Sequence, residues 1–249
     1  MKPLATVGFT LLMALTAAQA GSPSLLANAV EKSDRVAVRH LLKEHLYVNA
    51  PQVDGMTALH WAAHLDDLET ARLLLKDGAD ATSENRYGVT PLSLACANGN
   101  SDLVELLLAA GADPNTTLRG GETVLMIAAR TGGVGPVNAL LVHGARAGEK
   151  ERRGQTALMW AAAEGHTAVV AMLLKAGVDF RASLPDSGFT PLFFAVREGR
   201  TEVVRTLLKA GAEVNQPMQP KNTTGKGPKK GMSPLVLAVE SGHFDLAVA

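Results

Sequence analysis

Two histidines four residues apart are the first residues in this chain whose spacing suggests chemistry. His60 and His64 would lie on one face of a helix, as two metal ligands do. A zinc peptidase would also carry a glutamate directly after the first histidine, and Trp61 stands there instead. We therefore expect no metal site.

Other catalytic patterns are also missing from the sequence. The basic segment Lys226–Lys230 lacks the G-x-x-x-x-G-K-[ST] pattern of a phosphate-binding loop, and no G-x-S-x-G nucleophile motif occurs. Cys96 is the single cysteine, which excludes an intramolecular disulfide and a thiolate metal cluster. It lies in an alanine-rich run that is typical of a small buried residue. The sequence predicts a protein that is not an enzyme and binds no cofactor.

Arginines that recur at one interval are the strongest candidates for binding. Arg86, Arg119 and Arg152 are each 33 residues apart, and Arg153 follows the third. A guanidinium offers a planar fork that fits a carboxylate or a phosphate, and it stays charged at physiological pH. A single exposed arginine is usually a solvated loop residue, but an aligned set indicates a binding site.

Four more residues join this candidate site by their position. Arg130 and Arg197 each follow a recurring threonine by seven residues, so both would face the same groove. Tyr87 and Phe189 would add aromatic contact area of the kind that is enriched at binding hot spots.

The arginine interval belongs to a repeat that covers most of the chain. Each unit carries a threonine, a glycine two residues before it, and a Leu-Leu pair near the end. The threonines are Thr57, Thr90, Thr123, Thr156 and Thr190.

Each unit is expected to form two helices and a projecting loop. The threonine would cap the first helix, which runs over about eight residues, as in 156–164. Glycines such as Gly99 and Gly132 would end that helix in the left-handed conformation, with Asp66 in that role in one unit. The second helix carries the Leu-Leu pair, and in one unit Gly132, Gly133 and Gly135 would open it.

This pattern resembles the ankyrin repeat, which has a 33-residue period and the motif T-P-L-H-x-A. The motif stands here as Thr57-Ala-Leu-His-Trp-Ala62 and Thr90-Pro-Leu-Ser-Leu-Ala95, among others, but the family histidine survives only at His60. The resemblance implies an all-α solenoid whose loop tips and first helices line a concave face that binds protein partners.

Composition divides the chain into segments. Residues 1–20 are expected to be a signal peptide, because residues 4–18 are apolar and uncharged, and Ala18-Gln19-Ala20 offers a cleavage site. The apolar run is too short to span a membrane comfortably. Residues 21–54 would form a degenerate N-terminal capping repeat, and 55–215 the second to sixth repeats. Residues 216–230 would be a basic flexible insertion, and 231–249 an incomplete seventh repeat. In that repeat the Leu-Leu pair would follow Ala249, so we expect the array to continue in a longer protein.

These expectations lead to a non-catalytic interaction scaffold of the periplasm or extracellular space. The net charge is zero, which argues against nucleic acid as the partner. The arginines favour an acidic segment of a protein partner or a cell-envelope anion. Two other hypotheses remain open: the chain could be the regulatory or targeting part of a longer enzyme, or an exported effector that binds a host protein.

Overall fold

The structure is a computed structural model that describes residues 24–44, 47–221 and 230–248. The predicted signal peptide, residues 222–229 of the predicted insertion and Ala249 lie outside the described residues. Within the described residues every regular element is a helix, as the all-α prediction requires. The helices are α2 Leu25–Glu31, α3 Arg35–Lys43, α4 Ala58–His64, α5 Leu68–Lys76, α6 Pro91–Asn98, α7 Ser101–Ala109, α8 Val124–Thr131, α9 Val134–Val142, α10 Ala157–Glu164, α11 Thr167–Lys175, α12 Pro191–Arg197, α13 Thr201–Lys209, α14 Pro234–Glu240 and α15 Phe244–Val248.

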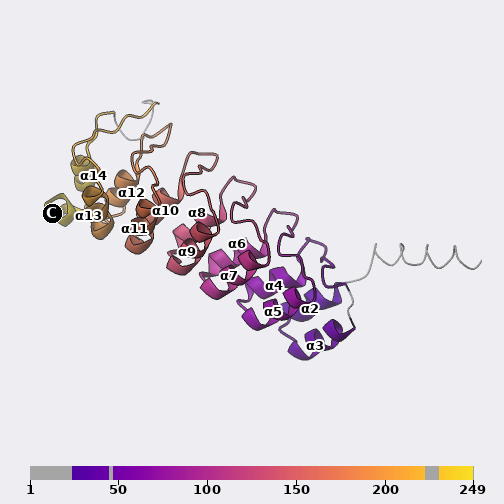
Figure 1. Ribbon diagram of the computed structural model, residues 1–249. Coiled ribbons are helices and arrows are strands. Elements are labelled where there is room, and N and C mark those ends of the chain that lie inside the picture. Colours follow the sequence, from indigo (N-terminus) through magenta and orange to yellow (C-terminus); the bar gives the residue numbers. More distant parts are fainter. Residues whose placement is uncertain (1–23, 45–46, 222–229, 249) are drawn as a thin grey trace, which may run out of the picture.

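The helices form two layers in an elongated stack (Figure 1). The first helices of the units, α2, α4, α6, α8, α10, α12 and α14, pack one against the next, and the second helices form the other layer. The connecting loops project from the stack on the side of the first helices. No helix in the described part of the chain is long and apolar enough to cross a membrane.

The predicted threonine caps are present. In α4, for example, Thr57 accepts a hydrogen bond from the His60 backbone, and the His60 side chain accepts one from the Thr57 backbone. Thr190 occupies the cap position of α12 without a side-chain bond. Asp66 has a φ of 59°, the left-handed conformation expected where other units use glycine.

The expectation for the fourth unit is wrong in part, because Gly132 ends the first helix, as glycines in its register were expected to, and does not open the second. Gly132 ends α8 in the left-handed conformation with a φ of 79°, and Gly133 is the N-cap of α9. Both therefore stand outside the second helix, at positions where glycine is suited to the backbone. Gly135 is the one glycine of the three that lies within α9.

The core is a continuous column of Leu, Val and Ala side chains. Leu59, Leu74, Leu92, Leu107, Leu140, Leu158 and Leu173 are among its fully buried members. Small alanines of the first helices, such as Ala95 and Ala161, allow neighbouring units to approach closely. Cys96 is fully buried among them, as its alanine-rich surroundings predict.

Side-chain hydrogen bonds join neighbouring units although most units lack the family histidine. His60 contacts the Val89 carbonyl at 3.0 Å through Nε2. Asn49 donates to the Gly78 carbonyl and accepts from the Asp80 backbone. Asn115, two units further on, repeats both bonds with the Gly144 carbonyl and the Arg146 backbone. These two asparagines were not among the predicted contacts, although they share a register 66 residues apart.

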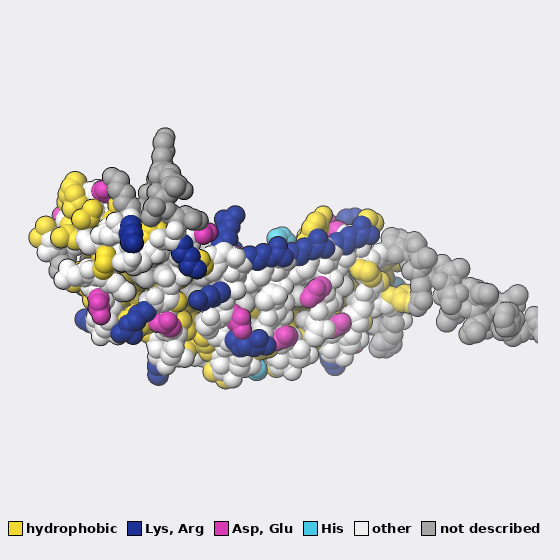
Figure 2. Space-filling model, turned by 90° about the horizontal axis from the view of Figure 1, so that it is seen from above, with side chains coloured by type: hydrophobic (Ala, Val, Ile, Leu, Met, Phe, Trp, Pro, Cys, Tyr) yellow, Lys and Arg dark blue, Asp and Glu magenta, His cyan; other side chains and the backbone are white. Residues whose placement is uncertain are grey.

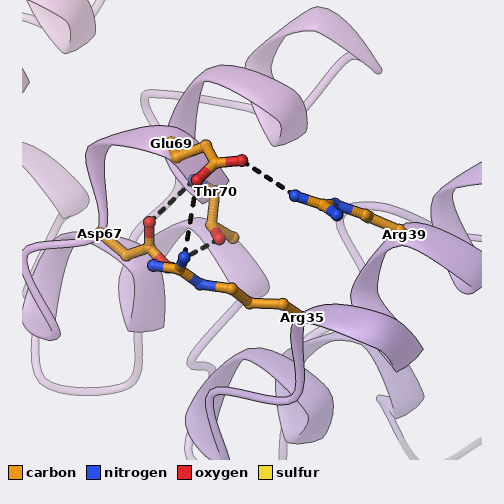
Figure 3. A network of polar contacts seen from close by, with 5 residues as sticks. All are labelled: Arg35, Arg39, Asp67, Glu69 and Thr70. Atoms are coloured by element: carbon orange, nitrogen blue, oxygen red, sulfur yellow. Dashed lines mark hydrogen bonds and ion pairs between the residues drawn. The ribbon is translucent and has the colours of Figure 1, made fainter.

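The first unit is tied to the second by charged side chains (Figure 3). Arg39 Nη2 lies 3.1 Å from Glu69 Oε1, and Arg35 lies 3.5 Å from Asp67 and 3.6 Å from Glu69. Burial of Asp67 disfavours its charged form, but hydrogen bonds from Thr70 and the charge of Arg35 hold its pKa below the ordinary value. Asp67 is thus kept ionised where it caps α5.

The insertion opens from the tip of the last loop. The Met218 backbone donates to the Met232 carbonyl at 2.8 Å, and the Gly231 backbone donates to the Met218 carbonyl at 3.0 Å. The Met218 side chain is 1% exposed. The insertion therefore begins at a residue that is buried in the packed array, and α14 packs against α12 of the preceding unit.

Candidate partner-binding surface

The candidate arginines stand on loop tips that share one backbone structure. In the loop before Thr90, the Asn85 backbone donates to the Val89 carbonyl at 3.0 Å, and the Gly88 backbone donates to the Asn85 carbonyl at 3.0 Å. These two bonds close a tight turn in which Arg86 occupies the second position. Gly88 has a φ of 75°, a conformation that most side chains would strain.

The next two tips repeat this turn. The Leu118–Glu122 and Leu118–Gly121 pairs make the same two bonds around Arg119. The Glu151–Gln155 and Glu151–Gly154 pairs make them around Arg152, again at 2.8–3.0 Å. The same turn therefore presents all three arginines.

Side chains at the base of two tips stiffen the turn. Asn85 Oδ1 accepts from the backbones of Tyr87 and Val89, at 2.9 and 3.0 Å. Glu151 Oε1 accepts from the backbones of Arg153 and Gln155 at the same two distances. Because Asn85 and Glu151 each accept hydrogen bonds from the backbone of their own loop, the backbone at the neighbouring Arg86 and Arg152 is held in one conformation.

Each arginine also lies over the tip glycine of the preceding unit. A Cβ atom at Gly88 would lie 3.4 Å from Arg119 Cγ, and one at Gly121 would lie 3.5 Å from the Arg152 backbone nitrogen. The Arg119 guanidinium donates to the Arg86 carbonyl. Consecutive tips are therefore in direct contact, and the arginines follow one another from unit to unit.

Together these residues form the arginine row, which we define as Arg86, Arg119, Arg152 and Arg153. All four are exposed. Seen from the loop side, Lys and Arg side chains run along one edge of the molecule over its N-terminal half (Figure 2). Among residues 24–44, 47–221 and 230–248, none of the four forms an ion pair with a carboxylate. The row is thus a line of positive charge that has no carboxylate partner among those residues.

Two exposed apolar side chains lie at the N-terminal end of the row. Tyr87, next to Arg86, is 64% exposed. Val53 is 83% exposed and stands four residues before the N-cap Thr57, at the tip position that arginine takes in the next three loops. The row therefore has exposed apolar side chains at its N-terminal end and positive charge along the rest.

Arg130 is exposed but engaged within the protein. Its Nη1 atom lies 3.1 Å from Glu122 Oε1, and its guanidinium carbon lies 5.3 Å from the centre of the Trp160 ring in the next unit. These contacts join two units. Arg130 lies in the last turn of α8, one of the first helices, and it is already paired with a carboxylate.

Phe189 is not a surface aromatic, which corrects the sequence expectation. Its ring is 5% exposed and packs against Phe193 and Phe194, with centroids 5.9 and 5.3 Å away. Arg197 lies over Phe189 and Phe194 and pairs with Glu198 at 2.8 Å. Met56 and Met232, which also stand directly before the N-cap of a first helix, are buried too. Their apolar character is the sequence signal that would have placed Phe189 in the core.

The paired histidines have separate surroundings. His60 is fully buried and bonded to Thr57 and the Val89 carbonyl, whereas His64 is exposed with its ring against Trp61. In the part of the chain that the structure describes, no three His, Cys, Asp or Glu side chains gather as metal ligands would.

Comparisons with known proteins agree with this architecture. A family model described as ankyrin repeats (3 copies) matches residues 26–118 and 125–218. The crystal structure of the human ASB11 ankyrin repeat domain superposes with a TM-score of 0.76 at 24% sequence identity, over 92% of this chain and 97% of that one. A search of curated protein sequences found no match. With the family model covering most of its length, the chain belongs to the ankyrin-repeat family.

Proposed function

We propose that this chain is a non-catalytic scaffold that binds an acidic segment of a protein partner along the arginine row. Ankyrin repeats bind protein partners, and the fold is in general an interaction scaffold. The observation that carries the proposal is the absence of internal counterions for the row among the described residues. Arginines 130 and 197, by contrast, already have carboxylate or aromatic partners within the protein.

The charge of the row favours a partner with several carboxylates. The whole chain is neutral, yet Lys and Arg side chains line one edge of the molecule over its N-terminal half (Figure 2). Exposed ion pairs are individually weak, and several along one line are needed for useful affinity. Binding should weaken as salt is raised, because exposed charges are screened over about 8 Å at physiological ionic strength.

We also propose that the mature protein acts in the periplasm or outside the cell. The support lies in the sequence of residues 1–20, with its uncharged apolar run and the Ala18-Gln19-Ala20 site. N-terminal sequencing of the protein from its native source tests this, and Gly21 is the expected first residue. An intact Met1 in the soluble cytoplasmic fraction would contradict it.

Partner capture by matched variants tests the binding surface. The first variant changes Arg86, Arg119 and Arg152 to Ala. The control changes Arg72, Lys175 and Arg205 to Ala, which removes the same charge from exposed positions on the second helices. Bound proteins are identified from a native extract by mass spectrometry, and the folding of each variant is checked by circular dichroism. Partners that the control retains and the row variant loses support the proposal. Equal capture by both variants would contradict it, and capture of a non-protein envelope polyanion would replace the partner class.

A further inference from the structure

The arginine row has a spacing that selects among partner conformations. Successive arginines differ by one stacked unit, and packed helices lie about 8–10 Å apart. Arg119 contacts both Gly88 and the Arg86 carbonyl, so the stagger between tips is fixed by direct packing. A partner that engages all three arginines must therefore present three carboxylates at this same interval, on one side.

A polyproline II segment meets this requirement. It has three residues per turn and rises about 3.1 Å per residue, so every third side chain points the same way at intervals of about 9 Å. In a β-strand, side chains on one face lie about 6.6–6.8 Å apart, and they fall out of step with the arginines after two units.

The apolar end of the row favours the same partner over a helix. An α-helix with acidic residues seven apart would repeat about every 10 Å, but a bound helix needs a groove for its apolar face. The row is a line of exposed tips. Tyr87 and Val53, at its N-terminal end, are exposed apolar side chains of the kind against which proline rings pack.

We propose, building on the function above, that the row binds a polyproline II segment with an acidic residue at every third position. Arg86, Arg119 and Arg152 each take one carboxylate, and Tyr87 packs against a proline ring near the first. The spacing of the charges, and not their number alone, then decides affinity.

Fluorescence polarisation with labelled peptides tests this on the full chain. One nine-residue peptide repeats Glu-Pro-Pro three times, and a second has the same composition with its three glutamates consecutive. The first should bind about five- to tenfold more tightly, since consecutive glutamates cannot reach three arginines at once. Tyr87→Ala should weaken binding of the first peptide, and Tyr87→Phe should retain it.

The outcomes separate this inference from the proposed function. Equal affinity for both peptides, with both lost in the triple arginine variant, would overturn the spacing and leave the row as a binding surface. Unchanged binding of both peptides by that variant would overturn both proposals. Tighter binding of a helical peptide with glutamates seven apart, or of single-stranded DNA, would also overturn the polyproline II assignment.

Discussion

Gly135, in the first turn of α9, lies directly against Ser101 at the start of α7. A Cβ atom at position 135 would be 1.8 Å from Ser101 Oγ and 2.7 Å from Ser101 Cβ. The missing side chain of Gly135 is therefore what lets the second helices of two neighbouring units pack together.

Gly135→Ala should destabilise the protein although alanine favours a helix. The gain in helix propensity is about 1 kcal/mol, whereas overpacking costs about 1–3 kcal/mol. Urea unfolding followed by circular dichroism measures the difference. Gly148→Ala is the control, because a Cβ atom added there would meet no atom within 4 Å and the φ of Gly148 is not left-handed. If Gly135→Ala is as stable as Gly148→Ala, then Ser101 can move away from the added methyl group without cost, which would contradict the prediction.

Leu173→Ala should destabilise the protein more than Leu174→Ala. Leu173 is fully buried, whereas the adjacent Leu174 is only partly buried. Removing a fully buried leucine side chain costs about 2–5 kcal/mol, because a cavity remains. Chemical denaturation of the two variants decides the order, and the reverse order would contradict the packing described for α11.

Stability should fall as the pH drops below about 6.5, in part through His60. Burial lowers the pKa of His60 from its ordinary value of 6.5, despite the Val89 carbonyl and nearby Asp54 and Asp80. The unfolded chain then takes up a proton more readily than the folded protein does. The contribution is fully present above pH 6.5 and is lost as the pH falls towards the lowered pKa.

Urea midpoints at pH 8 and pH 5 measure this effect. His60→Ser places the residue found at the same position in the next unit, Ser93, and should reduce the difference between the two midpoints. His64→Ser removes an exposed imidazole four residues away and is the matched control. An undiminished pH difference in His60→Ser would exclude His60 as the source.

Cys96 should resist thiol reagents while the protein is folded. Burial raises the pKa of its thiol to about 12, so the reactive thiolate is scarce at pH 8, and the side chain is not exposed to solvent. Labelling with a maleimide should proceed in urea and be negligible in buffer. Fast labelling of the native protein would mean that the third unit opens readily.

The helix ends could be predicted because one residue type recurs in one register. Each threonine before a helix has the same unpaired backbone donors to satisfy, so five units give five independent signs of the same cap. The arginine row could be proposed for the same reason, because arginine recurs in one register. A register repeated along a solenoid places its members side by side.

Other features depend on packing between units, which one register does not reveal. Positions 173 and 174 are both leucine, and only the orientation of α11 about its axis buries Leu173 more than Leu174. Phe189 was expected to add aromatic contact area at the binding site, yet its loop turns the side chain into the core. From the sequence, Gly135 predicts only a weaker helix, and its contact with Ser101 becomes visible in the structure.

The turn at each tip has a consequence for how this scaffold can diversify. Val53 and Arg86 occupy the same position of the same hydrogen-bonded turn, so the backbone accepts unrelated side chains there. The glycine two residues later is left-handed at both tips and cannot vary in the same way. Variation among relatives should therefore concentrate at the position two residues before each tip glycine. A new binding specificity can then arise by substitution at one position per unit, without a change in the fold.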